Sequence, residues 1–163
     1  SSLSKKKKDK TNAIRLVEQQ NISYQEYEYA WNEAQLSADH VADELDENIS
    51  QIFKTLVVVG NKTGTLVAVV PGDRELDLKK IAKVSQNKKV EMLHLKDLEK
   101  TTGYIRGGCS PIGMKKKFPT YIDITAKDFA SILVSAGKRG LQIELAPEDL
   151  ANLVNGEFAD ITV

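Results

Sequence analysis

Two runs of β-branched and apolar residues, 54–59 (KTLVVV) and 65–70 (TLVAVV), form the clearest hydrophobic pattern in the chain. The segment between them, GNKTG, contains two glycines and an asparagine, which suit the dihedral angles of a tight turn. We therefore predict a β-hairpin. Because apolar residues follow one another along both strands, we expect both faces of the hairpin to be covered.

Shorter periodic segments flank the hairpin. Apolar residues three or four apart, behind capping residues such as Thr11 or Asn12, Ser37 and Pro147, predict helices over 12–20, 38–45, 75–87, 95–101 and 147–155. Alternating or continuous apolar segments predict strands over 23–29, 88–93, 120–124, 131–135, 141–145 and 158–163. Strands outnumber the helices that could connect parallel strands. We therefore predict an α+β fold, with a mixed β-barrel-like sheet and peripheral helices, and not a doubly wound parallel sheet.

Length and composition indicate one folded domain. The chain has 163 residues, of which 41% are hydrophobic and 28% charged, as is usual for a single globular domain. Residues 1–10, with four successive lysines, are predicted to be a flexible basic tail, and residues 11–163 the folded domain. No apolar run approaches the roughly 18 residues that span a bilayer, and a single cysteine forms no internal disulfide. We expect a cytoplasmic protein with no membrane partner.

The net charge is zero, which argues against a general binder of polyanions. Basic residues nevertheless gather at Lys115, Lys116 and Lys117 and again at Lys138 and Arg139. Such clusters can contact the phosphates of a nucleic acid. An ordinary solvated surface explains the charges equally well on their own, and this alternative stays open.

The loop GYIRGGCSPIG, residues 103–113, holds the only cysteine. A nucleophilic Cys109 needs a nearby base, and the sequence places neither His40 nor His94 beside it, so a small buried residue is the simpler interpretation. The two histidines have no HxxxH or HExxH spacing, so no metal site is predicted. The loop also lacks the GxGxxG spacing of a phosphate-binding loop.

Two features remain as candidates for a binding site. Gly107 and Gly108 let the backbone approach a ligand, and Pro111 fixes the chain behind them, so the loop can direct N–H groups at a carbonyl; a plain tight turn is the alternative. Lys54 begins the most apolar strand, so its amine should lie at the rim of a buried surface. There it can hold an anion or a carbonyl, or simply extend to solvent from the strand end.

Five segments in order resemble the YbaK/EbsC family of stand-alone aminoacyl-tRNA editing enzymes, related to the editing domain inserted in bacterial prolyl-tRNA synthetases. They are FKTLVV (53–58), ELDLKKIAK (75–83), KKVEM (88–92), TGYIRGGCSPIG (102–113) and SAGKRGLQIEL (135–145). The resemblance covers residues 11–161 and implies a single domain without a cofactor. It also implies hydrolysis of the ester in mischarged tRNA(Pro), above all Cys-tRNA(Pro), with prolyl-tRNA synthetase as a possible partner. Pocket fit separates amino acids of similar size by only about 1–3 kcal/mol, which makes such editing necessary.

The resemblance also implies roles for individual residues. Lys54 matches the essential lysine, Gly107 and Gly108 the loop that faces the aminoacyl group, and Thr55, Tyr29 and Ser135 polar positions of the pocket. The loop residues Cys109, Ser110 and Pro111 are counted with the substrate-binding positions, as is Gln142, which stands where relatives often have aspartate.

In the cysteine-editing branch, the resemblance implies that the substrate thiol attacks its own ester. Removal of alanine or another small amino acid, and a non-catalytic module that binds tRNA ends or nucleotides, remain the alternatives.

Overall fold

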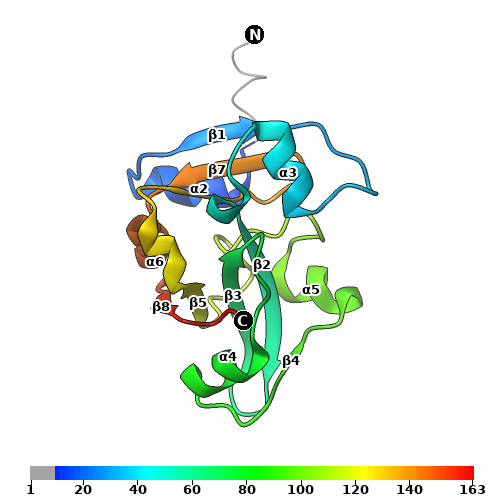
Figure 1. The fold of residues 1–163 in the computed structure, drawn as a ribbon, viewed down its shortest axis with the longest axis vertical. Coiled ribbons are helices and arrows are strands. Elements are labelled where there is room, and N and C mark those ends of the chain that lie inside the picture. The colour runs from blue at the N-terminus through cyan, green and yellow to red at the C-terminus, as the bar shows by residue number, and fades with distance from the viewer. Residues whose placement is uncertain (1–9) are drawn as a thin grey trace.

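The computed structural model describes residues 10–163, so the predicted tail lies, apart from Lys10, outside the described residues. Its strands form two sheets (Figure 1). The larger sheet has the order β4-β2-β3-β5-β8 and the smaller one the order β1-β7-β6. The strands are β1 (Gln25–Glu28), β2 (Phe53–Gly60), β3 (Gly64–Pro71), β4 (Val90–Met92), β5 (Thr120–Asp123), β6 (Ile132–Ser135), β7 (Leu141–Leu145) and β8 (Glu157–Ala159). The predicted mixed α+β fold is confirmed: β3 and β5, and β5 and β8, are parallel, and the remaining pairs of named strands are antiparallel.

Helices surround the sheets as predicted. Thr11 caps the first one, accepting a hydrogen bond from the N–H of Ile14, and Ser37 caps the next in the same way. Pro147 occupies the first turn of the last helix. The helices are α2 (Asn12–Gln19), α3 (Ala38–Leu45), α4 (Leu78–Val84), α5 (Leu98–Thr102) and α6 (Pro147–Val154), with the short 3-10 turns η1 (Ile49–Gln51), η2 (Leu95–Asp97) and η3 (Ile124–Asp128). None of the helices in residues 10–163 has the length and apolar character needed to cross a bilayer.

The hairpin is the centre of the fold. β2 and β3 pair antiparallel along their whole length, from Phe53 opposite Pro71 to Gly60 opposite Gly64. Successive residues of β3 enter different cores: Val67 and Val69 pack in the larger cluster, and Leu66, Ala68 and Val70 in a second one. β3 is therefore covered on both faces, as its uninterrupted apolar sequence predicts.

The sheets do not close into a barrel. β2 pairs with β3 along one edge, and on its other edge it pairs with β4 only from residue 58 onward. Within residues 10–163, one parallel bridge, between Ile52 and Leu133, joins the backbone of the smaller sheet to that of the larger one. Residues 53–56 of β2 therefore lie between these two contacts, and no strand of the described residues pairs with them on that edge. The barrel-like character predicted from the sequence is thus limited to two sheets that share a hydrophobic core and are joined by hydrogen bonding at the bridge between Ile52 and Leu133.

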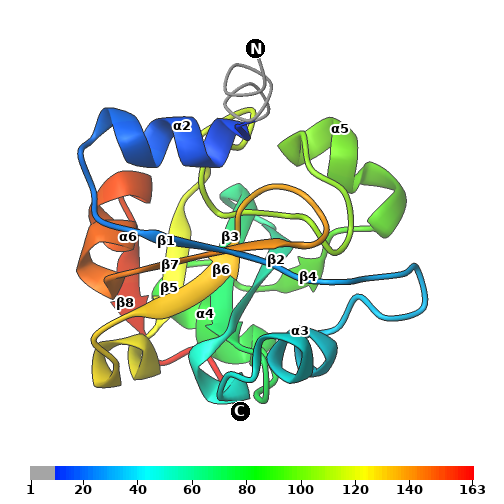
Figure 2. The same cartoon turned by 90° about the horizontal axis from the view of Figure 1, so that it is seen from above.

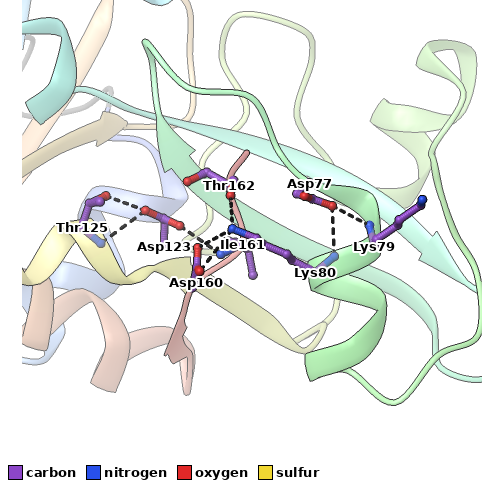
Figure 3. A network of polar contacts seen from close by, with 8 residues as sticks. All are labelled: Asp77, Lys79, Lys80, Asp123, Thr125, Asp160, Ile161 and Thr162. Carbon is purple, nitrogen blue, oxygen red and sulfur yellow. Dashed lines mark hydrogen bonds and ion pairs between the residues drawn. The ribbon is translucent and has the colours of Figure 1, made fainter.

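A polar network fixes the C-terminal segment against β5 and α4 (Figure 3). The fully buried carboxylate of Asp123 accepts hydrogen bonds from the N–H of Ile161 (3.1 Å) and from the hydroxyl of Thr125 (2.6 Å). On α4, the amine of Lys80 donates to the carbonyl of Thr162 at 2.7 Å and pairs with Asp160 at 3.2 Å. A buried carboxylate is tolerated because its oxygens are hydrogen-bonded.

Candidate functional site

A cavity of about 620 Å³ lies where β2 has its free edge. Five successive residues of β2, 53–57, line it. The start of α3, η2, α5 and the loop around residue 107 also contribute to its wall, and Figure 2 shows α3 and α5 on the same side of the molecule. The predicted positions that line the cavity are Tyr29, Lys54, Thr55, Gly107, Cys109, Ser135 and Gln142. The fold thus brings together residues that are up to 113 positions apart in the chain.

Lys54 provides a cation at this cavity. Its side chain is 28% exposed, and its amine lies 3.9 Å from a carboxylate oxygen of Glu75, whose side chain is 85% exposed. An ion pair this long and this exposed to water is weak, so the amine is available to a ligand. Arg106 is the second cation of the lining, and Asp39 and Glu75 are its acids. None of these last three residues was predicted as part of the site.

Two polar atoms at the cavity wall are buried without a hydrogen-bond partner among residues 10–163. They are the hydroxyl of Thr55 and the side-chain oxygen of Gln142, which is 5% exposed as a residue. Gln142 on β7 lies opposite Ser135 on β6 in the sheet register, and the Ser135 hydroxyl accepts from the N–H of Gly137 at 3.2 Å. Leaving a buried polar group unpaired costs about 1–3 kcal/mol, so these two residues of the cavity wall are candidates for contact with a ligand.

The two predicted glycines have different surroundings. Gly107 lines the cavity at φ +83°, a left-handed conformation, and an added Cβ would lie 3.0 Å from Leu36. Gly108 packs instead against the backbone of residues 138 and 139, where an added Cβ would lie 2.9 Å from their atoms. Its N–H donates to the carbonyl of Ile105 at 2.9 Å. Gly107 therefore shapes the cavity, and Gly108 holds the loop against its neighbour.

Cys109 borders the cavity as a protonated thiol. Burial raises its pKa from the ordinary 9.0 to about 11, against a smaller opposing effect of a hydrogen bond with Thr102. Neither histidine is among the residues that line the cavity; His40 instead contacts the carbonyl of Ala30 at 2.7 Å. A thiol without a base and with a raised pKa is a poor nucleophile. Within residues 10–163, no group of three His, Cys, Asp or Glu residues is placed to hold a metal ion.

The remaining predicted residues lie away from the cavity lining. Ser110 is fully buried and its hydroxyl accepts from the N–H of Ile112 at 3.2 Å, a contact that stabilises the turn. Pro111 lines a second, smaller hollow of about 150 Å³, together with Lys116 and Lys117. Lys115 donates to the carbonyl of Lys100 at 3.2 Å.

Lys138 and Arg139 follow β6 on the loop against which Gly108 packs. Lys138 is exposed, and Arg139 donates from Nε to the carbonyl of Arg106 at 2.8 Å. Of the two predicted basic clusters, this one therefore contacts a residue of the cavity wall.

Comparison with known proteins gives a consistent result. The model of the aminoacyl-tRNA editing domain family matches residues 32–153. EbsC of Enterococcus faecalis, whose name proposes Cys-tRNA(Pro)/Cys-tRNA(Cys) deacylase activity, is 66% identical over 158 residues, covering 97% of this chain and 96% of that protein. A proline–tRNA ligase of Kosmotoga olearia is 30% identical over 104 residues, covering 64% of this chain and 18% of the ligase. A crystal structure described as a candidate trans-editing enzyme for prolyl-tRNA synthetase has a TM-score of 0.80 at 22% identity and covers 95% of this chain and 99% of that one.

Proposed function

Because the chain belongs to the aminoacyl-tRNA editing domain family, we propose that it is a deacylase that hydrolyses the ester of mischarged tRNA(Pro), above all Cys-tRNA(Pro). We assign this activity to residues 11–163 and expect it in the cytoplasm, where tRNA is charged. The name of the 66% identical EbsC supports cysteine as the amino acid and includes Cys-tRNA(Cys) as a second substrate. Selection of tRNA(Pro) through a complex with prolyl-tRNA synthetase is part of the proposal, supported by the similarity to proline–tRNA ligases.

One observation carries the proposal: the cavity lining contains an available cation, Lys54, and two residues, Thr55 and Gln142, whose buried polar atoms have no hydrogen-bond partner among residues 10–163. A volume of about 620 Å³ is within the range of small-molecule sites, roughly 300–1,000 Å³, and is suitable for an aminoacyl-adenosine end. The hydroxyl of Thr55 and the side-chain oxygen of Gln142 are acceptors, which suit the α-ammonium group of the amino acid. Gln142 keeps the acceptor that an aspartate would supply at this position but not its charge.

The chemistry can proceed without a protein nucleophile. The sulfur of the bound cysteine attacks its own ester carbonyl, a C–S bond forms, and the C–O bond to the ribose breaks. The thiol proton ends on the ribose oxygen, so tRNA leaves with a free hydroxyl and a thiolactone remains, which water opens to cysteine. In this scheme Lys54 stabilises the negative charge that develops on the carbonyl oxygen, or orients the adjacent phosphate, while Gly107 gives the acyl group close access to the backbone.

The test is deacylation of Cys-tRNA(Pro), Ser-tRNA(Pro) and Ala-tRNA(Pro) by the wild type and by Lys54→Ala. Lys89→Ala is the matched control, because Lys89 is an exposed lysine whose amine pairs with Glu91 on the surface, away from the cavity lining. We expect the wild type to release cysteine alone. The rate of this release should be lower by roughly 100-fold or more in Lys54→Ala and unaltered in the control. Equal rates for the wild type and Lys54→Ala would refute the role of Lys54. Release of alanine from Ala-tRNA(Pro) would indicate that water attacks the ester. If no amino acid were released from any of the three substrates, a non-catalytic binding module would be the better interpretation.

A further inference from the structure

Trp31, the only tryptophan of the chain, is 43% exposed. Tyr29, two residues earlier, lines the cavity, and its N–H donates to the carbonyl of Gly140 at 3.0 Å. The indole lies against this same glycine, where an added Cβ would be 2.7 Å from Trp31 Cδ1. A large aromatic side chain that is held in place and yet left partly open to solvent is unusual, because tryptophan is on average strongly buried.

A cation lies over the indole. The guanidinium of Arg139 lies over the ring at 5.3 Å from its centroid, and Arg139 also donates to the carbonyl of Arg106 at 2.8 Å. Arg106 and Lys138 are exposed. The one nearby acid in this group of contacts is Glu33, 3.9 Å from Arg139 and 87% exposed. Arg139 thus lies over the aromatic ring, and two exposed cations, Arg106 and Lys138, belong to the segments that Arg139 joins.

This arrangement is the one that proteins use for unpaired nucleic acid, in which a base stacks on an aromatic ring and cations follow the phosphates. We infer that Trp31, with Arg106, Lys138 and Arg139, forms a stacking platform for an unpaired nucleotide base at the 3′ end of the tRNA substrate. The inference rests on the proposed function. The platform adjoins the cavity wall, because Arg139 donates a hydrogen bond to the carbonyl of Arg106, which lines the cavity.

The platform is also fixed before the ligand arrives. Arg139 covers part of the ring, Gly140 supports its edge, and Gly108 packs against the backbone of residues 138 and 139. A side chain that is already ordered loses little conformational freedom when a base stacks on it. The nucleotide base therefore makes a stacking contact outside the cavity. This contact does not alter which amino acid the cavity selects.

The single tryptophan allows a direct test that needs no deacylation. Uncharged CCA trinucleotide is titrated into the full-length protein while tryptophan fluorescence is recorded, with heparin as a control that carries negative charge but no base. We expect a saturable change with CCA and none with heparin. The same change with both ligands, or none with CCA, would overturn the inference, and either result is obtained whether or not the protein proves to be a deacylase.

A kinetic test follows in the active enzyme. Trp31→Ala should raise the KM for Cys-tRNA(Pro) by roughly 5- to 100-fold with little effect on kcat, and Trp31→Phe, which keeps a ring, should recover most of this loss. The ratio of kcat/KM for Cys-tRNA(Pro) to that for cysteinyl-adenosine, which lacks the neighbouring base, should fall by the same factor. Equal losses on both substrates, or no recovery with phenylalanine in a variant that melts like the wild type, would contradict base stacking.

Discussion

Replacing Thr55 by valine should make the protein more stable and less active. Valine keeps the β-branched shape that suits β2 and replaces a buried hydroxyl that has no hydrogen-bond partner among residues 10–163. The free protein is therefore relieved of an unpaired polar group. If this hydroxyl accepts a hydrogen bond from the substrate ammonium, the same change removes a contact that only the bound state makes.

The magnitude follows from the burial. An unpaired buried hydroxyl costs about 1–3 kcal/mol, so Thr55→Val should raise the free energy of unfolding by about that amount. For a chain of this size each kcal/mol corresponds to about 2–4 °C in melting temperature. Loss of a hydrogen bond to a charged group, about 1.5–3 kcal/mol, should lower kcat/KM about 10- to 100-fold.

Thermal unfolding and deacylation of Cys-tRNA(Pro) measure the two effects. The matched control is Thr120→Val on β5, because Thr120 is also buried in a strand but its hydroxyl donates to the carbonyl of Phe118 at 2.9 Å. The control should lose about 1 kcal/mol of stability. If Thr55→Val melted below the wild type, as the control should, the hydroxyl would have a partner and the binding argument built on it would fail.

Three further predictions concern other parts of the molecule. Asp123→Ala should lower the free energy of unfolding by about 3 kcal/mol, since the N–H of Ile161 loses its partner; an unaltered denaturant midpoint would contradict this. Gly108→Ala should cost about 1–3 kcal/mol, because its Cβ meets rigid backbone at 2.9 Å, and wild-type melting would disprove that clash. The pKa of Cys109 is raised from 9.0 to about 11 in the folded protein, so as the pH rises this thiol ionises first in the unfolded chain. Between pH 9 and 11 the free energy of unfolding of the wild type should therefore fall more than that of Cys109→Ala. Parallel plots of unfolding free energy against pH for the two proteins would contradict this prediction.

The sequence predicts the elements of this fold well because their signals are local. The hairpin follows from two apolar runs and the turn between them, and the position of Lys54 follows from its place at the start of the first run. These features depend on residues close together in the chain, so pattern and composition are sufficient to find them.

The missing strand partner of β2 was not predictable, because it depends on how two sheets diverge after the bridge at Ile52. The course of the loop after residue 106 was likewise not predictable, because it depends on tertiary contacts. Cys109 borders the cavity, whereas Ser110 is buried in the turn and Pro111 lines the second hollow. Contacts within the loop set this path, for example the hydrogen bond from the Tyr104 hydroxyl to the carbonyl of Ile112 at 2.6 Å. Arg106 and Trp31 were missed because their importance comes from distant neighbours.

The raised pKa of Cys109 protects the protein from acylation by the product of the proposed reaction. A thiolactone is an activated acyl donor, and any thiolate within reach would capture it and leave the enzyme covalently blocked. With a pKa of about 11, only about one molecule in ten thousand carries the Cys109 thiolate at pH 7. Burial therefore keeps this thiol protonated and poorly nucleophilic. The proposed cavity can release a reactive thiolactone to water without acylation of Cys109.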